Sequence, residues 1–137
     1  MDNAMEKDAQ LTAWPKGISA ITLFVEDMEA AKEFYQTVFG LPVDYEDDAS
    51  TVFKFGNTVV NLLKTSAAPE LIEPAAVAGR EAGHRFMFTI EVDDVDAMCA
   101  QLVARGVKLL NGPMDRPWGI RTASFVDPGG HIWEIAK

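Results

Sequence analysis

Apolar and polar positions alternate in the same order in two separate stretches of the chain. In the first stretch, the apolar, β-branched run 18–25 predicts a strand, and Asp27 follows as the N-cap of a helix. Apolar residues then recur three and four positions apart, as on one helix face, until Gly40 and Pro42 end the helix. Three short strands are predicted at 43–45, 51–55 and 58–63, with the turn Gly56-Asn57 between the last two.

The second stretch repeats this order. A strand is predicted at 86–92, Asp94 is the N-cap, and Gly106 ends the helix. The apolar helix positions are Val95, Met98, Cys99, Leu102 and Val103, and the strands that follow are 107–110, 121–126 and 132–136. The repeat predicts an α+β domain of two tandem βαβββ modules that form a curved mixed sheet around a cleft. The modules are 17–63 and 84–137, the linker is 64–83, and 1–16 is a polar N-terminal leader.

Length and charge narrow the function. A chain of 137 residues forms one domain, and its net charge of −9 argues against nucleic acid as a partner. The same charge attracts small cations, although it also serves solubility alone. The apolar runs are too short to cross a membrane, the N-terminus lacks an apolar signal core, and Cys99 has no disulfide partner. We therefore predict a cytoplasmic protein without a membrane partner.

Candidate chemistry is concentrated in the last 27 residues, 111–137. Asn111-Gly112-Pro113 opens a turn, and a loop then presents Trp118 and Arg121, with Arg116 expected at the surface. Asp127-Pro128-Gly129-Gly130 predicts a hairpin turn, and Glu134 lies inside the final strand. A buried charge in a strand has to be paired, solvated or bound to a metal.

These motifs resemble the vicinal-oxygen-chelate superfamily, which includes glyoxalase I, extradiol dioxygenases, and fosfomycin- and bleomycin-resistance proteins. The resemblance rests on the segments 25–41, 92–107 and 127–136. The Pro-Trp-Gly-x-Arg run at 117–121 is similar to the bleomycin-resistance branch. The resemblance to the superfamily implies the two-module fold, but this fold hosts several unrelated reactions and does not by itself identify the function.

Metal-dependent members of that superfamily place ligands at four inward positions, two in each module. By the resemblance, these positions fall on Ala20, Asn61, Met87 and Glu134. Only Glu134 is a good ligand, whereas a divalent site needs about three nitrogen or oxygen ligands. His84 and His131 do not match these positions and are expected to be surface or half-buried residues. We predict no metal and no cofactor.

Strand alternation assigns the remaining side chains, with Ala20 and Glu134 taken as inward. Thr22, Phe24, Met87, Thr89 and Ile132 then face the cleft, whereas Leu23, Val25, Phe88, Trp133 and Ile135 lie beneath the helices. The predicted ligand-binding residues are Phe24, Phe53, Asn61, Met87, Trp118, Arg121 and Glu134. A core position is an equally good alternative for Phe24, Phe53 and Met87. Trp118 could stack on a flat ring or a cation, or pack at a dimer interface.

Arg121 could hold a ligand carboxylate or neutralise Glu134, and a structural ion pair is the alternative. The resemblance implies a metal-free protein that binds a small aromatic or cationic, drug-like ligand in grooves between the subunits of a homodimer, as in antibiotic resistance. The alternative is a glyoxalase-like lyase or isomerase with Glu134 as general base or metal ligand. A structural or regulatory module with a filled cleft is a third hypothesis.

Overall fold

The computed structural model describes Ala13 and residues 17–137, so the predicted leader 1–16 lies outside the described residues except for Ala13. The first module consists of β1 (Ala20–Val25), α2 (Met28–Thr37), β2 (Tyr45–Glu46), β3 (Ser50–Phe55) and β4 (Thr58–Lys64). The second consists of β5 (Met87–Glu91), α4 (Val95–Ala104), β6 (Leu109–Asp115), β7 (Arg121–Val126) and β8 (Ile132–Ala136). Between them lie the short helical turns η1 (Thr65–Ala67), α3 (Pro69–Ile72) and η2 (Arg80–Ala82). This order confirms an α+β fold with two tandem βαβββ modules.

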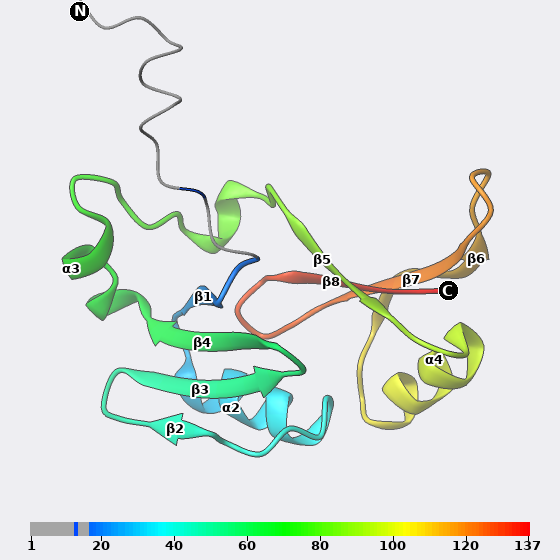
Figure 1. Ribbon diagram of the computed structural model, residues 1–137, viewed down its shortest axis with the longest axis horizontal. Helices are drawn as coiled ribbons and strands as arrows, with labels where there is room; N and C mark the ends of the chain where they lie inside the picture. The colour runs from blue at the N-terminus through cyan, green and yellow to red at the C-terminus, as the bar shows by residue number, and fades with distance from the viewer. Residues whose placement is uncertain (1–12, 14–16) are drawn as a thin grey trace, which may run out of the picture.

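Each module forms its own four-stranded mixed sheet. The strand orders are β1-β4-β3-β2 and β5-β8-β7-β6, so β1 and β5 are edge strands (Figure 1). β1 pairs with β4 in parallel, and β5 pairs with β8 in the same way, whereas neighbouring strands elsewhere are antiparallel. The two sheets therefore have the same topology, as the sequence repeat predicts.

Both main helices begin at the predicted aspartates. The Asp27 carboxylate accepts a hydrogen bond from the backbone N–H of Ala30, and the Asp94 carboxylate accepts one from Ala97. These bonds satisfy N–H groups that the first turn of a helix leaves without a partner. The caps fix where each helix starts after its strand, and so fix which face the helix turns to the sheet.

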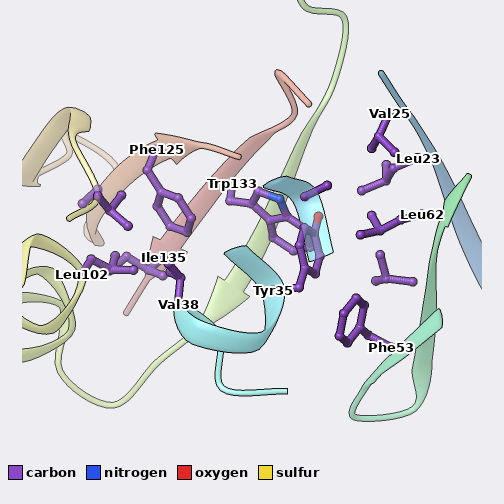
Figure 2. Close-up of a cluster of buried hydrophobic side chains, with 14 of the residues drawn as sticks. Leu23, Val25, Tyr35, Val38, Phe53, Leu62, Leu102, Phe125, Trp133 and Ile135 are labelled. Atoms are coloured by element: carbon purple, nitrogen blue, oxygen red, sulfur yellow. The ribbon is translucent and has the colours of Figure 1, made fainter. Parts of the chain in front are cut away.

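The helix-facing sides of the two sheets share one hydrophobic core. Figure 2 shows side chains of both sheets directed toward α2, where Tyr35 lies beside Trp133. Tyr35 also stacks on Phe53 of the first sheet, with ring centroids 5.4 Å apart. The core therefore joins the modules through α2. Its buried residues from the two sheets are Leu23, Val25, Phe53, Val60, Leu62, Ala123, Phe125, Trp133 and Ile135.

A buried carboxylate, Asp127, ties the β7–β8 turn to the first module. It accepts hydrogen bonds from the Tyr35 hydroxyl at 2.8 Å and from the backbone N–H groups of Gly129 and His131. The ring nitrogen Nδ1 of the half-buried His131 lies 3.0 Å from the Asp127 carboxylate. The indole N–H of Trp133 donates to the same carboxylate at 3.4 Å. Burial by itself raises the pKa of Asp127, but its hydrogen bonds and the adjacent His131 outweigh burial and bring that pKa below its ordinary value. The network links both modules at one point.

Two details differ from the sequence prediction. β6 runs to Asp115, because Gly112 continues an irregular strand in which the pairing register shifts instead of opening a turn. A Cβ at Gly112 would come within 2.5 Å of the Thr122 carbonyl oxygen, so this close approach requires glycine. Val103, predicted on the buried helix stripe, is 57% exposed.

Among the described residues, none of the helices is long and apolar enough to span a membrane.

Candidate functional site

Each sheet has a second side that points away from the shared core, because side chains alternate along a strand. We call these sides open face A, on the first sheet, and open face B, on the second. The strand registers place on open face A Ala20, Thr22, Phe24, Val52, Lys54, Val59 and Asn61. They place on open face B Met87, Thr89, Asn111, Thr122, Ser124, Ile132 and Glu134.

Most of the predicted inward residues lie on these faces. Phe24 and Asn61 lie on open face A, and Met87 and Glu134 lie on open face B. Within a single chain, both open faces point away from the shared core. The predicted site residues of one chain are therefore divided between two separate faces. A cleft that brought these residues together would need another surface opposite each face.

Phe53 does not lie on an open face. Its side chain is fully buried and stacks on Tyr35. Val52 is the β3 residue opposite Asn61, so the neighbouring Phe53 points to the other side. The prediction that Phe53 lines the cleft is therefore wrong in its face assignment, and the core alternative describes this residue.

The two open faces carry equivalent polar pairs. Thr22 lies opposite Asn61 on open face A, and Thr89 lies opposite Glu134 on open face B. The Thr89 hydroxyl donates to Glu134 Oε1 at 2.9 Å, whereas Asn61 Nδ2 lies 3.5 Å from the Thr22 hydroxyl. The buried Oδ1 of Asn61 has no hydrogen-bond partner among the described residues. A buried acceptor without a partner costs about 1–3 kcal/mol.

Arg121 lies on the helix-facing side of the second sheet, opposite to the side of Glu134. Its guanidinium donates to both carboxylate oxygens of Asp96 on α4, each at 2.9 Å, and to Asp115 at 3.0 Å. Hydrogen bonds from Arg121 lower the pKa of Asp96, and those to both carboxylates raise the pKa of Arg121. The predicted pairing of Arg121 with Glu134 is therefore wrong, and the structural ion pair is the correct alternative.

We expect Arg121→Gln to lower stability only slightly and to leave ligand binding unchanged. Arg121 is half-buried, but both of its carboxylate partners are exposed to solvent, where ion pairs contribute little and are screened by salt. Urea unfolding at low and high salt measures this, since the difference from wild type should shrink as salt is added. A loss of ligand affinity in the variant would contradict this assignment.

Arg116, which was expected at the surface, is a half-buried residue over open face B. Its Nε donates to the hydroxyl of the buried Thr122 at 2.8 Å, and its Nη2 donates to Asn111 Oδ1 at 2.9 Å. The short β6–β7 loop closes by the bonds from Arg116 N–H to the Ile120 carbonyl and from Gly119 N–H to the Arg116 carbonyl. Trp118 lies in this loop and is 69% exposed. The loop therefore delivers a guanidinium to open face B and leaves the indole in solvent.

The four family ligand positions do not form a donor set that suits a divalent metal. Asn61 offers one neutral amide oxygen, Met87 a thioether and Ala20 nothing, so Glu134 is the only carboxylate among them. Among the described residues, no group of three or more His, Cys, Asp or Glu side chains is arranged to hold a metal ion. The residues present thus do not fit the metal that other members of the superfamily hold.

A hollow of about 300 Å³ adjoins open face A at Phe24. Segment 77–86 and the β7–β8 turn form its other walls, and its rim includes Arg80, His84 and Arg85. Phe24 is thus a predicted ligand residue that lines this hollow. The hollow extends open face A toward the second module.

Two tandem βαβββ modules, with equivalent side-chain pairs on two open sheet faces, define a protein of the vicinal-oxygen-chelate type. The chain belongs to the Glyoxalase/Bleomycin resistance protein/Dioxygenase superfamily, whose family model matches residues 17–135. It is 34% identical over 122 residues to the uncharacterised protein YraH of Bacillus subtilis, covering 85% of this chain and 94% of that protein.

Solved structures show the same architecture. A glyoxalase/bleomycin resistance protein/dioxygenase from Nocardioides superposes with a TM-score of 0.83 at 25% identity, covering 96% of this chain and 89% of the other. A glyoxalase-related enzyme from Fulvimarina pelagi gives a TM-score of 0.75 at 25% identity, covering 89% and 88% of the two chains. A lactoylglutathione lyase from Agrobacterium tumefaciens, at 24% identity and a TM-score of 0.72 over 89% of this chain and 93% of its own, shares the fold.

Proposed function

We propose that this chain is a metal-free small-molecule-binding protein of the bleomycin-resistance type, acting in the cytoplasm as a homodimer. In this proposal, open face A of one copy lies against open face B of the other, and each ligand binds between them. The ligand is small, with an aromatic or cationic part. The observation that carries the proposal is that both faces holding the family's ligand positions turn away from the core of their own chain.

Large apolar side chains on and beside the open faces support a second copy as the covering surface. Met87 is 47% exposed and Met114 36% on open face B, and Tyr45 is 55% exposed opposite Val52 of open face A. Apolar side chains that gather at an exposed surface often mark an interaction site. The edge strands β1 and β5 also leave backbone groups available for contacts with another chain.

The chemistry of the faces favours a ligand with an apolar body and a few polar groups. Open face A offers the side-chain amide of Asn61, and open face B offers Glu134, which accepts a hydrogen bond from Thr89. A carboxylate in such a setting can accept from an amine or hydroxyl of the ligand. The net charge of −9 also draws cationic molecules toward the protein.

We expect Met87→Arg to abolish both dimerisation and ligand binding, because it places a charge in the middle of the proposed contact. Val103→Arg is the matched control, since Val103 is also exposed and apolar but lies on α4, away from both open faces. Analytical ultracentrifugation measures the dimer, and calorimetry with bleomycin and other flat cationic aromatic drugs measures binding. The wild type and V103R should dimerise and release heat with a member of this panel.

The proposal fails if the wild type is a monomer at the concentrations used for calorimetry and no member of the panel binds. It also fails if M87R dimerises and binds as the wild type does. Stoichiometric divalent metal in the purified protein that is lost in Glu134→Gln would contradict the metal-free assignment. That result would instead favour the lyase or isomerase alternative, with Glu134 as a ligand.

A further inference from the structure

Open face B holds a cation whose charge is not matched by a carboxylate. The Arg116 guanidinium is fixed by Thr122 Oγ1 at 2.8 Å and Asn111 Oδ1 at 2.9 Å, and both of these oxygens are neutral. Among the described residues, no carboxylate forms an ion pair with Arg116. Arg105 also lacks a carboxylate partner among the described residues and donates to the Val38 carbonyl, so what distinguishes Arg116 is its position over open face B.

The neighbouring Arg121 differs from Arg116 in being paired with carboxylates. Arg121 binds Asp96 and Asp115, so its donors are occupied by two carboxylates on the helix-facing side. Arg116 uses Nε and Nη2 on neutral acceptors and has further N–H groups without a partner in the described residues. Those N–H groups suit a bidentate contact with a carboxylate.

Glu134 lies on the same face of the second sheet as the Arg116 guanidinium. Ser124 is directly opposite Glu134, and the two residues that hold Arg116 flank Ser124, with Asn111 paired to it and Thr122 two positions along β7. Thr122, which holds Arg116, is a diagonal neighbour of Glu134, and such neighbours lie about 7–8 Å apart. We therefore expect one small molecule to span both charges. Arg116 and Glu134 themselves form no ion pair in the described residues, which leaves both available to a ligand.

We infer that open face B binds a small zwitterion, an amino acid with an apolar or aromatic side chain, with Arg116 holding its carboxylate and Glu134 its ammonium group. This inference rests on the proposed function and names the ligand class of that site. Met87 and Ile132, on the same face, supply the apolar contact for the side chain of the ligand. Arg116 determines specificity, because a ligand without an acid leaves the guanidinium unmatched.

The test compares three probes on the full-length protein: L-tryptophan, its methyl ester and indole-3-propionic acid. The ester lacks the carboxylate, and the propionic acid lacks the ammonium group. We expect wild type to bind tryptophan about tenfold to a hundredfold more tightly than either, the range for one charged hydrogen-bonded contact. Arg116→Gln should remove the preference for the acid over the ester, and Glu134→Gln should remove the preference for tryptophan over the propionic acid.

Arg116→Lys keeps the charge without the fork and should retain part of the acid preference. Lys108→Gln is the control for net charge, because Lys108 is exposed and lies on neither open face; it should behave as wild type. If Arg116 has only a structural role, Arg116→Gln should lower the affinity for all three probes equally and leave the ratios of their affinities unchanged. That result would overturn the inference.

Equal affinity of wild type for tryptophan and its ester would also overturn the inference, while leaving the proposed function intact. Binding of none of the three probes would reject a zwitterionic ligand. The proposed function would then be decided separately, by dimerisation and by the panel of cationic drugs.

Discussion

Asp127→Ala should destabilise the protein by about 3 to 5 kcal/mol, because it removes the shared acceptor of several buried donors. The lost partners include the Tyr35 hydroxyl, the His131 ring and two backbone N–H groups of the β7–β8 turn. Asp127 is 3% exposed, so water cannot replace the carboxylate without opening the core. Urea unfolding measures the change as a lower midpoint at an unchanged slope.

Tyr35→Phe is the matched control, because it removes one donor and keeps the ring that stacks on Phe53. It should cost about 1.5–3 kcal/mol, the range for a hydrogen bond to a charged group. A change of Asp127→Ala no larger than this would show that the carboxylate does not join the modules as the structure indicates.

The stability contributed by Asp127 should depend on pH in a definite direction. The folded-state pKa of Asp127 is lowered, so its contribution is fully present above the unfolded-state pKa of about 3.9. It is lost as the pH falls through the lower folded-state pKa, because the protonated carboxyl is a poorer acceptor. The free energies of unfolding of wild type and Asp127→Ala, measured across the acid range, should therefore converge at low pH and differ most near neutrality.

The sequence repeat predicted much of the fold because each module is encoded locally. Aspartate caps, glycine helix ends and the apolar helix stripes recur in both modules, and the structure places Asp27 and Asp94 at the predicted N-caps. The faces of β1, β5 and β8 also follow from alternation once one residue on each strand is assigned. What the repeat could not decide is whether the open faces meet within one chain or between two.

The two incorrect site assignments could have been avoided from hairpin geometry. Across the two-residue turn Gly56-Asn57, Phe55 pairs with Thr58, and counting back from Asn61 places Val52 inward. The same count across the β7–β8 turn pairs Ser124 with Glu134. An inward Val52 puts Phe53 in the core, and an inward Ser124 puts Arg121 on the helix-facing side.

The position of Arg116 was not predictable in this way. The pairing of β6 with β7 shifts twice, between Leu109 and Asn111 and between Asn111 and Met114, so alternation cannot be counted along this strand. The close approach of Gly112 to Thr122 is a tertiary feature without a local signal. The position of Arg116 over open face B therefore follows only from the structure.

Phe53→Ala should lower stability by about 3 to 5 kcal/mol, the usual cost of emptying a fully buried aromatic position. The Phe53 ring is 0% exposed and stacks on Tyr35, which in turn contacts Trp133 of the second sheet. A cavity here should therefore weaken the core that both modules share. Thermal and urea unfolding measure the loss.

Val52→Ala is the neighbouring variant on the opposite side of β3, beside Asn61 on open face A. It should cost about 1 kcal/mol or less, because Val52 is only half-buried, but it should weaken ligand binding if open face A contributes to the site. Phe53→Ala protein that remains folded at low temperature should bind with nearly unchanged affinity, since the ring does not reach the face. A stable Phe53→Ala variant that loses ligand binding would contradict this assignment. It would show that Phe53 contacts the ligand and that the binding face is the other side of the sheet.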